Sequence, residues 1–279
     1  MRWGISVKKL IFAASFLAAS AVTASAADLA ARPYTKATPI AAAAYDWSGF
    51  YVGATAGGAW SKDAVSLNTV NGEPPLYDTS DIPSLNALGS SQLNQSHGIF
   101  GGRIGYNYQV SSLVVGLEGD LSSFRFNRSA SATGIPFNPG GAPFGNAAFN
   151  QNASTSWLAT VRGRIGYAAD RVLFYGTAGA AFANVKFSNS YLGFSQHGTG
   201  DEAEASASSA TKTGWAAGAG IEYALTNNWI VSAEYLHVDL GSLSTSGLVT
   251  TGAPENATFN FSTKLTSDIA RAGISYKFR

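Results

Sequence analysis

Eight charged residues set among apolar ones are the candidates for chemistry in this 279-residue chain. Carboxylates can act as general acids or bases, whereas an equal number of arginines can neutralise them in ion pairs. Buried charge is very costly unless it is paired, so we interpret the set as one structural network rather than a catalytic one. Its members, four of each sign, are Arg103, Glu118, Asp120, Arg162, Arg164, Glu222, Glu234 and Arg271.

The other residues offer no second kind of site. The histidines, His97, His197 and His237, stand far apart and lack the spacing of metal ligands. The chain has no cysteine, which excludes disulfides and thiolate metal sites. No Ser, His and Asp residues are spaced as a catalytic set, and the glycine pairs follow no strand-to-helix pattern that would hold a phosphate. We therefore predict that the protein is not an enzyme and has no cofactor or metal.

Strands must position the charged residues, because these residues lie on one face of segments with a two-residue period. The pentapeptide GRIGY occurs at Gly102–Tyr106 and Gly163–Tyr167, with looser copies at Ala219–Tyr223 and Ala272–Tyr276. In each copy the Ile and the Tyr fall on the apolar face. Period two with one apolar face is typical of a strand between two unlike environments.

Four further segments alternate in the same way and bring the expected strands to eight: Gly49–Trp60, Leu113–Phe124, Val172–Lys186 and Trp229–Asp239. The connections at one end are short, at Gln109–Ser112, Ala168–Arg171 and Ala224–Asn228. Those at the other end are long, at Ser61–His97, Phe126–Thr155, Phe187–Thr211 and Gly241–Thr263. This layout predicts an all-β fold, an eight-stranded antiparallel up-and-down barrel that spans the outer membrane. A soluble β protein is the alternative.

Aromatic residues near the short turns are predicted to form the girdle at that membrane interface, where amphipathic rings are favoured. They are Trp47, Tyr106, Tyr108, Tyr167, Tyr223, Trp229, Tyr276 and Phe278.

The interior of an eight-stranded barrel is just wide enough for side chains to fill. With a symmetric four-residue turn, Arg103 faces Glu118 across the first hairpin, and Arg162 or Arg164 approaches Glu118 and Asp120 from the other side. We therefore expect a lumen plugged by paired charges.

Residues 1–26 combine a basic start, an apolar run and a small-residue cleavage site, which is typical of a secretory signal peptide; an N-terminal anchor helix is the alternative. Removing their three basic residues from 18 leaves 15 basic and 17 acidic residues, so no nucleic-acid partner is expected. Residues 27–46 are interpreted as a periplasmic segment and residues 47–279 as the barrel. No later apolar run reaches about 18 residues, so helical spans are not expected.

The segment YDWSGFYVG, Tyr45–Gly53, resembles the opening of small outer-membrane barrel proteins of the RopB type, eight-stranded relatives of the OmpA barrel. The resemblance covers nearly the whole chain. It implies a place in the outer membrane of a Gram-negative cell, among lipid and lipopolysaccharide. It also implies that the barrel-insertion machinery reads the last strand. The family usually ends on an aromatic residue, whereas Arg279 follows Phe278 here.

Three functions are compatible with these features. The balanced charges favour a structural barrel that contributes to envelope integrity and cell-surface properties. A small porin-like pore is the first alternative. A surface module that binds an unidentified extracellular ligand through its loops is the second.

Overall fold

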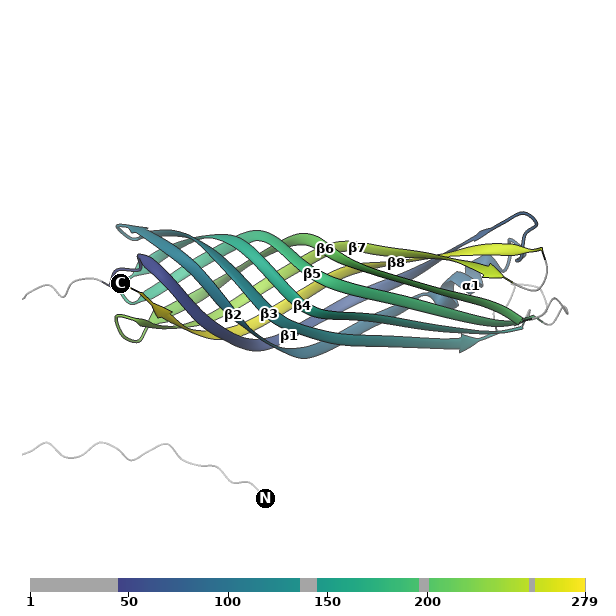
Figure 1. Cartoon of the computed structure of the whole chain (residues 1–279), viewed down its shortest axis with the longest axis horizontal. Helices are drawn as coiled ribbons and strands as arrows, with labels where there is room; N and C mark the ends of the chain where they lie inside the picture. The colour runs from purple at the N-terminus through teal and green to yellow at the C-terminus, as the bar shows by residue number, and fades with distance from the viewer. Residues whose placement is uncertain (1–44, 136–144, 196–200, 251–253, 279) are drawn as a thin grey trace, which may run out of the picture. The chain divides into compact units, whose positions relative to one another are not determined.

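Eight antiparallel strands close into one barrel in the structure, a computed structural model that describes residues 45–135, 145–195, 201–250 and 254–278 (Figure 1). Neighbours in sequence are neighbours in the ring, and the first strand pairs with the last. The predicted fold class is therefore confirmed. The predicted signal peptide, residues 1–26, and residues 27–44 of the predicted periplasmic segment lie outside the described residues.

The described elements follow one another in simple order. They are β1 (Gly49–Asn71), α1 (Ile82–Gly89), β2 (Ser91–Val110), β3 (Leu113–Gly134), β4 (Gly145–Ala169), β5 (Val172–Ser195), β6 (Asp201–Ala224), β7 (Trp229–Thr250) and β8 (Asn256–Lys277).

Tight turns join the strands at the end of the barrel where the described chain also finishes (Figure 1). Ser111 and Asp170 open two of these turns with φ angles of 57° and 51°. Positive φ suits two-residue hairpin turns, because their backbone twist then matches that of the flanking strands.

The register of the β2–β3 hairpin differs by two residues from the predicted one. Arg103 faces Asp120 rather than Glu118. The prediction was wrong because it gave the turn four residues, whereas the left-handed backbone of Ser111 closes a turn of two. A shift of two preserves side-chain parity, so Arg103 and both acids remain on the inner face.

The strands run far beyond their predicted ends, so strand makes up 18 of the 37 residues of the predicted loop Ser61–His97 and most of the other three predicted long loops. The strands have 20 to 25 residues, whereas about 9–11 tilted residues cross a bilayer. The barrel therefore consists of a turn-side half, which holds the predicted strands, and a far half of similar length.

The outer surface changes character between the two halves. Large apolar side chains are exposed around the turn-side half, among them Phe100 at 67% and Leu117 at 66%. Trp60, Trp215 and Tyr235 end this apolar band toward the far half. Beyond them the exposed positions are mainly polar or small, as at Ser66, Asn68, Asn94, Ser129 and Asn150.

The inner surface changes in the opposite sense. In the far half it carries a cluster of buried apolar side chains from all eight strands. Phe149 lies at its centre, with its ring centroid 4.8 Å from that of Tyr191 and 5.8 Å from that of Phe259. The far half is thus cored like a soluble protein, whereas the inside of the turn-side half is charged.

The ring of hydrogen bonds divides in the far half. The β2–β3 ladder ends at Phe100 and Ser123, and the β6–β7 ladder is interrupted between Ala203 and Trp215. Two four-stranded sheets result, β3–β4–β5–β6 and β7–β8–β1–β2, which pack face to face through the apolar cluster. We call this far half the outer sandwich, and its two unladdered boundaries the β2/β3 seam and the β6/β7 seam.

The helix α1 fills the end of the β2/β3 seam, where β1 has run past the start of β2 (Figure 1). Leu85 of α1 is fully buried. Asn86 Oδ1 accepts a hydrogen bond from the Thr69 backbone N at 3.0 Å, and Gln151 Nε2 donates one to the Gly89 carbonyl at 2.6 Å. No helix in the described part of the chain is long and apolar enough to cross a membrane.

Phe149→Ala should loosen the outer sandwich alone. Truncation of a buried Phe typically costs about 3–5 kcal/mol. Hydrogen exchange followed by mass spectrometry should therefore speed up in the far half of β4, β5 and β8 and stay unchanged in their turn-side halves.

The matched control is Phe100→Ala, which removes an exposed ring from the turn-side half and should leave the exchange of the outer sandwich unaltered. Equal acceleration in both halves of the strands would contradict a separately cored outer sandwich.

Candidate functional site

Arg162 of β4 is the centre of a charged cluster inside the turn-side half. Its side chain has no exposed surface. Nη2 donates to Glu118 Oε1 at 2.7 Å and to Asp120 Oδ2 at 2.9 Å, both on the adjacent β3. Nη1 donates across the lumen to Glu234 Oε1 on β7 at 2.8 Å. One guanidinium thus joins strands on opposite sides of the barrel.

Arg271 of β8 contacts two of the same acids from another side. Its Nε donates to Glu234 Oε2 at 2.7 Å, and its Nη1 donates to Asp120 Oδ1 at 3.0 Å. Each of these acids is therefore held between two guanidinium groups, which fixes its orientation as well as neutralising its charge.

A second layer lies nearer the turns. Arg164 Nη2 lies 3.0 Å from Glu222 Oε2, and Arg103 Nη1 lies 3.4 Å from Glu222 Oε1. Both arginines also approach Glu118, at 3.5 Å from Arg164 and 3.8 Å from Arg103. Glu118 is consequently the acid that connects the two layers.

The structure brings all eight predicted charged residues together. Their exposed fractions lie between 0 and 6%, and their formal charges sum to zero. We call this set the lumen network. Its purely structural role stays a prediction.

Sequence reasoning missed two neutral residues that contact the lumen network. Tyr51 donates from its hydroxyl to Glu118 Oε2 at 2.7 Å and accepts from Arg164 Nη1 at 2.8 Å. The ring of Tyr175 lies 4.0 Å below the Arg164 guanidinium. Both tyrosines alternate with outward-facing apolar residues, so strand parity alone would have placed them inside.

Trp47 does not belong to the aromatic girdle, contrary to the prediction. It is fully buried in the mouth of the barrel at the turn end. Its indole Nε1 donates to the Asp170 carbonyl at 3.0 Å, and its backbone N donates to Gln109 Oε1 at 2.7 Å. The prediction failed because Trp47 precedes the first strand residue, so strand parity does not apply to it.

Tyr45 completes this closure of the mouth. Its ring centroid lies 4.9 Å from that of Trp47, and its backbone N donates to Asp170 Oδ1 at 3.0 Å. Lys277 Nζ lies 4.4 Å above the Tyr45 ring. We call Tyr45 and Trp47 the mouth stopper. The other seven predicted girdle residues are all 36 to 60% exposed on the outside of the turn end.

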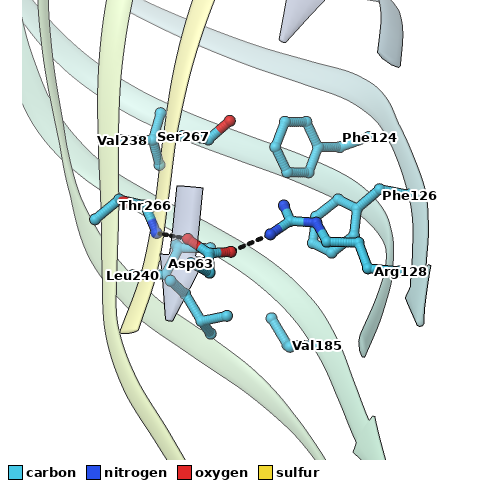
Figure 2. A pocket seen from close by; sticks show the side chains of 10 residues that line it. Asp63, Phe124, Phe126, Arg128, Val185, Val238, Leu240, Thr266 and Ser267 are labelled. Atoms are coloured by element: carbon cyan, nitrogen blue, oxygen red, sulfur yellow. Dashed lines mark hydrogen bonds and ion pairs between the residues drawn. The ribbon is translucent and has the colours of Figure 1, made fainter. Parts of the chain in front are cut away.

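An isolated ion pair joins the two sheets of the outer sandwich above the lumen network (Figure 2). Arg128 of β3 pairs with Asp63 of β1 and donates to the Leu93 carbonyl of β2 at 3.1 Å. Asp63 Oδ1 accepts from the Thr266 backbone N at 3.0 Å, where the β1–β8 ladder is interrupted. Figure 2 shows a small cavity beside this pair, lined mostly by apolar side chains that include Phe124.

The two histidines in the described residues lie apart. His97 packs inside against Phe124, with ring centroids 4.9 Å apart, and His237 lies outside with Nδ1 2.8 Å from Asp268 Oδ1. His197 lies outside the described residues. Nowhere in the described ranges do three His, Asp or Glu side chains converge as metal ligands.

The geometry is that of a closed barrel with an apolar band around a charged interior, and comparison with known proteins agrees with it. Residues 12–278 match the family of the outer membrane protein beta-barrel domain. The chain belongs to this family. It is an outer-membrane protein, and its apolar band faces the lipid of that membrane.

Two curated relatives are named as outer-membrane proteins. The 31 kDa outer-membrane immunogenic protein of Brucella melitensis is 31% identical over 276 residues, which cover 97% of this chain and 100% of that protein. The 22 kDa outer membrane protein of Rhizobium leguminosarum bv. viciae is 32% identical over 163 residues, 57% of this chain and 62% of that protein. Among solved structures, OprG from Pseudomonas aeruginosa aligns over 83% of this chain and 97% of its own, with 12% identity and a TM-score of 0.43.

Arg162→Met should destabilise the barrel by about 3–5 kcal/mol, because it leaves the buried network with one more negative than positive charge and removes three charged hydrogen bonds. The double variant Arg162→Met/Glu234→Gln should lose less than the sum of the two single changes, with a coupling energy of about 1–3 kcal/mol. Urea unfolding of the refolded protein in lipid vesicles measures all three free energies.

Arg125→Met is the control, because Arg125 is an exposed arginine on β3 and its loss should cost little. Strictly additive effects of the changes at positions 162 and 234 would show that the cross-lumen pair does not act as one unit.

Proposed function

We propose that this protein is a structural component of the outer membrane. In this role it is a closed, non-enzymatic barrel that contributes to envelope integrity and displays its outer sandwich at the cell surface. The observation that carries the proposal is Arg162, which has no exposed surface and is bound by three carboxylates from β3 and β7. A guanidinium so held stands in the path that any solute would need.

Two further barriers lie in line with the lumen network. The mouth stopper covers it at the turn end, and the apolar cluster of the outer sandwich fills the barrel beyond it. These three barriers differ in chemistry, one being charged and two apolar. A continuous aqueous path would require all of them to move, which argues against the porin-like alternative.

The outer sandwich supports a role in surface properties. Short turns of outer-membrane barrels lie in the periplasm, so the opposite end faces outward. The related Brucella melitensis protein is named an outer-membrane immunogenic protein. We propose that the outer sandwich is presented outside the cell, as a rigid two-sheet body rather than as loops. The YDWSGFYVG opening supports the finer assignment to the RopB type.

Two partners are part of the proposal. Arg125, Lys186 and Lys264 are exposed beyond the apolar band and would meet lipopolysaccharide phosphates by charge attraction. The outward aromatics Tyr276 and Phe278 at the end of β8 are the features that the barrel-insertion machinery would read.

Planar-bilayer recordings test the closed lumen. The protein is purified from membranes in detergent and added to a bilayer in about 1 M salt, which screens surface charge. It should give no stable conductance steps. A porin reconstituted in the same way is the positive control. Reproducible steps of porin size would overturn the proposal and favour the pore.

A further inference from the structure

Two buried carboxylates lie inside the outer sandwich at the β6/β7 seam without a cationic partner. Glu202 and Glu204 of β6 are 6% and 4% exposed, and they share a face of the strand. Glu202 Oε2 accepts hydrogen bonds from the hydroxyls of Tyr77 and Tyr191, at 2.8 Å each. Neither glutamate takes part in any ion pair recorded for the described residues.

The Glu204 carboxylate is less well hydrogen-bonded than that of Glu202. Neither of its carboxylate oxygens makes a hydrogen bond of good geometry, and the polar group beside it is the Ser206 hydroxyl. The carboxylate rests on Gly247 of β7, in the space that a Cβ would occupy there. The absence of a side chain at Gly247 is therefore what admits Glu204 into the seam.

A neutral oxygen completes the group. Asn189 of β5 is 4% exposed and donates from Nδ2 to Thr245 Oγ1 at 2.8 Å, whereas its Oδ1 has no partner. The register places Asn189 opposite Ser206 and Tyr191 opposite Glu204. Asn189 and Glu204 are thus diagonal neighbours on one face, a relation that spans about 7–8 Å.

The seam offers backbone oxygens in the same place. Residues 204–214 of β6 have no ladder with β7, so the edges of both strands present carbonyl groups without a ladder partner. Carboxylate, amide, hydroxyl and backbone oxygens are the ligands of hard cations. No nitrogen or sulfur ligand competes for the role in this group.

The charge of the group distinguishes a cation site from a purely structural role. An unpaired buried carboxylate is very costly, and Asp63 and the four acids of the lumen network all have arginine partners. Uptake of a proton and uptake of a cation are the two ways to relieve this cost. A protonated Glu204 could donate to Asn189 Oδ1, whereas a cation would also use the carbonyl groups of the free strand edges.

We propose that the β6/β7 seam is a binding site for a divalent hard cation, Ca²⁺, ligated by the Glu204 carboxylate and Asn189 Oδ1. Glu202 adds negative charge two residues along the strand, and Thr245 orients the Asn189 amide. Ca²⁺ suits this group better than Mg²⁺, because it accepts irregular oxygen coordination whereas Mg²⁺ requires near-ideal octahedral geometry. The bound ion would link β6 to β7 where their backbones are not hydrogen-bonded.

Terbium luminescence tests the site directly, since Tb³⁺ substitutes for Ca²⁺ and is sensitised by nearby tyrosines such as Tyr191. The full protein, purified from membranes in detergent and treated with chelator, is titrated with Tb³⁺ and then with competing Ca²⁺. Glu204→Gln should weaken binding by about tenfold or more, because ligand charge sets the affinity of such sites. Glu73→Gln, which removes an exposed carboxylate, should leave the affinity unchanged.

Hydrogen exchange supplies a second measurement that does not depend on luminescence. Added Ca²⁺ should slow exchange in residues 203–212 and 240–249 of the wild type, but not in Glu204→Gln or Asn189→Leu. Each variant is first checked for folding by its heat-dependent gel mobility. The proposal would be overturned if Glu204→Gln and Glu73→Gln bound Tb³⁺ with the same affinity. It would also be overturned if Ca²⁺ did not change hydrogen exchange of the seam in the wild type. Glu204 would then be a protonated core residue.

Discussion

The contact of Arg162 with three carboxylates is the interaction on which the membrane-embedded part of this barrel depends. An eight-stranded ring leaves no room for a hydration shell around a guanidinium, so protein groups must supply all of its partners. They come from the adjacent β3 and the opposite β7, and therefore fix the distance across the lumen. Strand register follows from the same contact, because a slip of one residue would turn the charged side chains toward lipid.

The reversal of polarity inside the barrel has a simple physical cause. Lipid tails are as apolar as leucine, so packing apolar side chains inside the membrane-embedded half would gain little over leaving them outside. Specific structure there must come from ion pairs and hydrogen bonds. Beyond the membrane the surroundings are water, and the hydrophobic effect again favours an apolar core. The strands continue through this change, although the inward-facing positions of β4 and β7 shift by one residue at the irregularities after Thr155 and Asp239.

Alternation along the chain was sufficient to predict the ring, the parity of the turn-side half of each strand and the eight charged residues of the lumen network. It also contained the outer sandwich, since Val65 and Leu67 alternate with Ser66 and Asn68. That signal was read as loop because a strand needs few residues to cross a bilayer and the polar face is rich in Ser and Asn. The position of Trp47 and the two seams were beyond such reasoning. They depend on contacts between distant segments, and period two does not report on backbone pairing.

The mouth stopper has a consequence for the order of events in assembly. Its anchors are Gln109, near the end of β2, and Asp170, in the turn that follows β4, yet the stopper itself precedes β1 in the chain. The segment made first must therefore wait for at least four strands to be in place before it can dock. The mouth stopper docks at the periplasmic end of the barrel. This end would therefore close from the periplasm, after the strands that anchor the stopper have inserted into the membrane. An incompletely assembled barrel would keep this end unsealed, with its aromatic segment accessible in the periplasm.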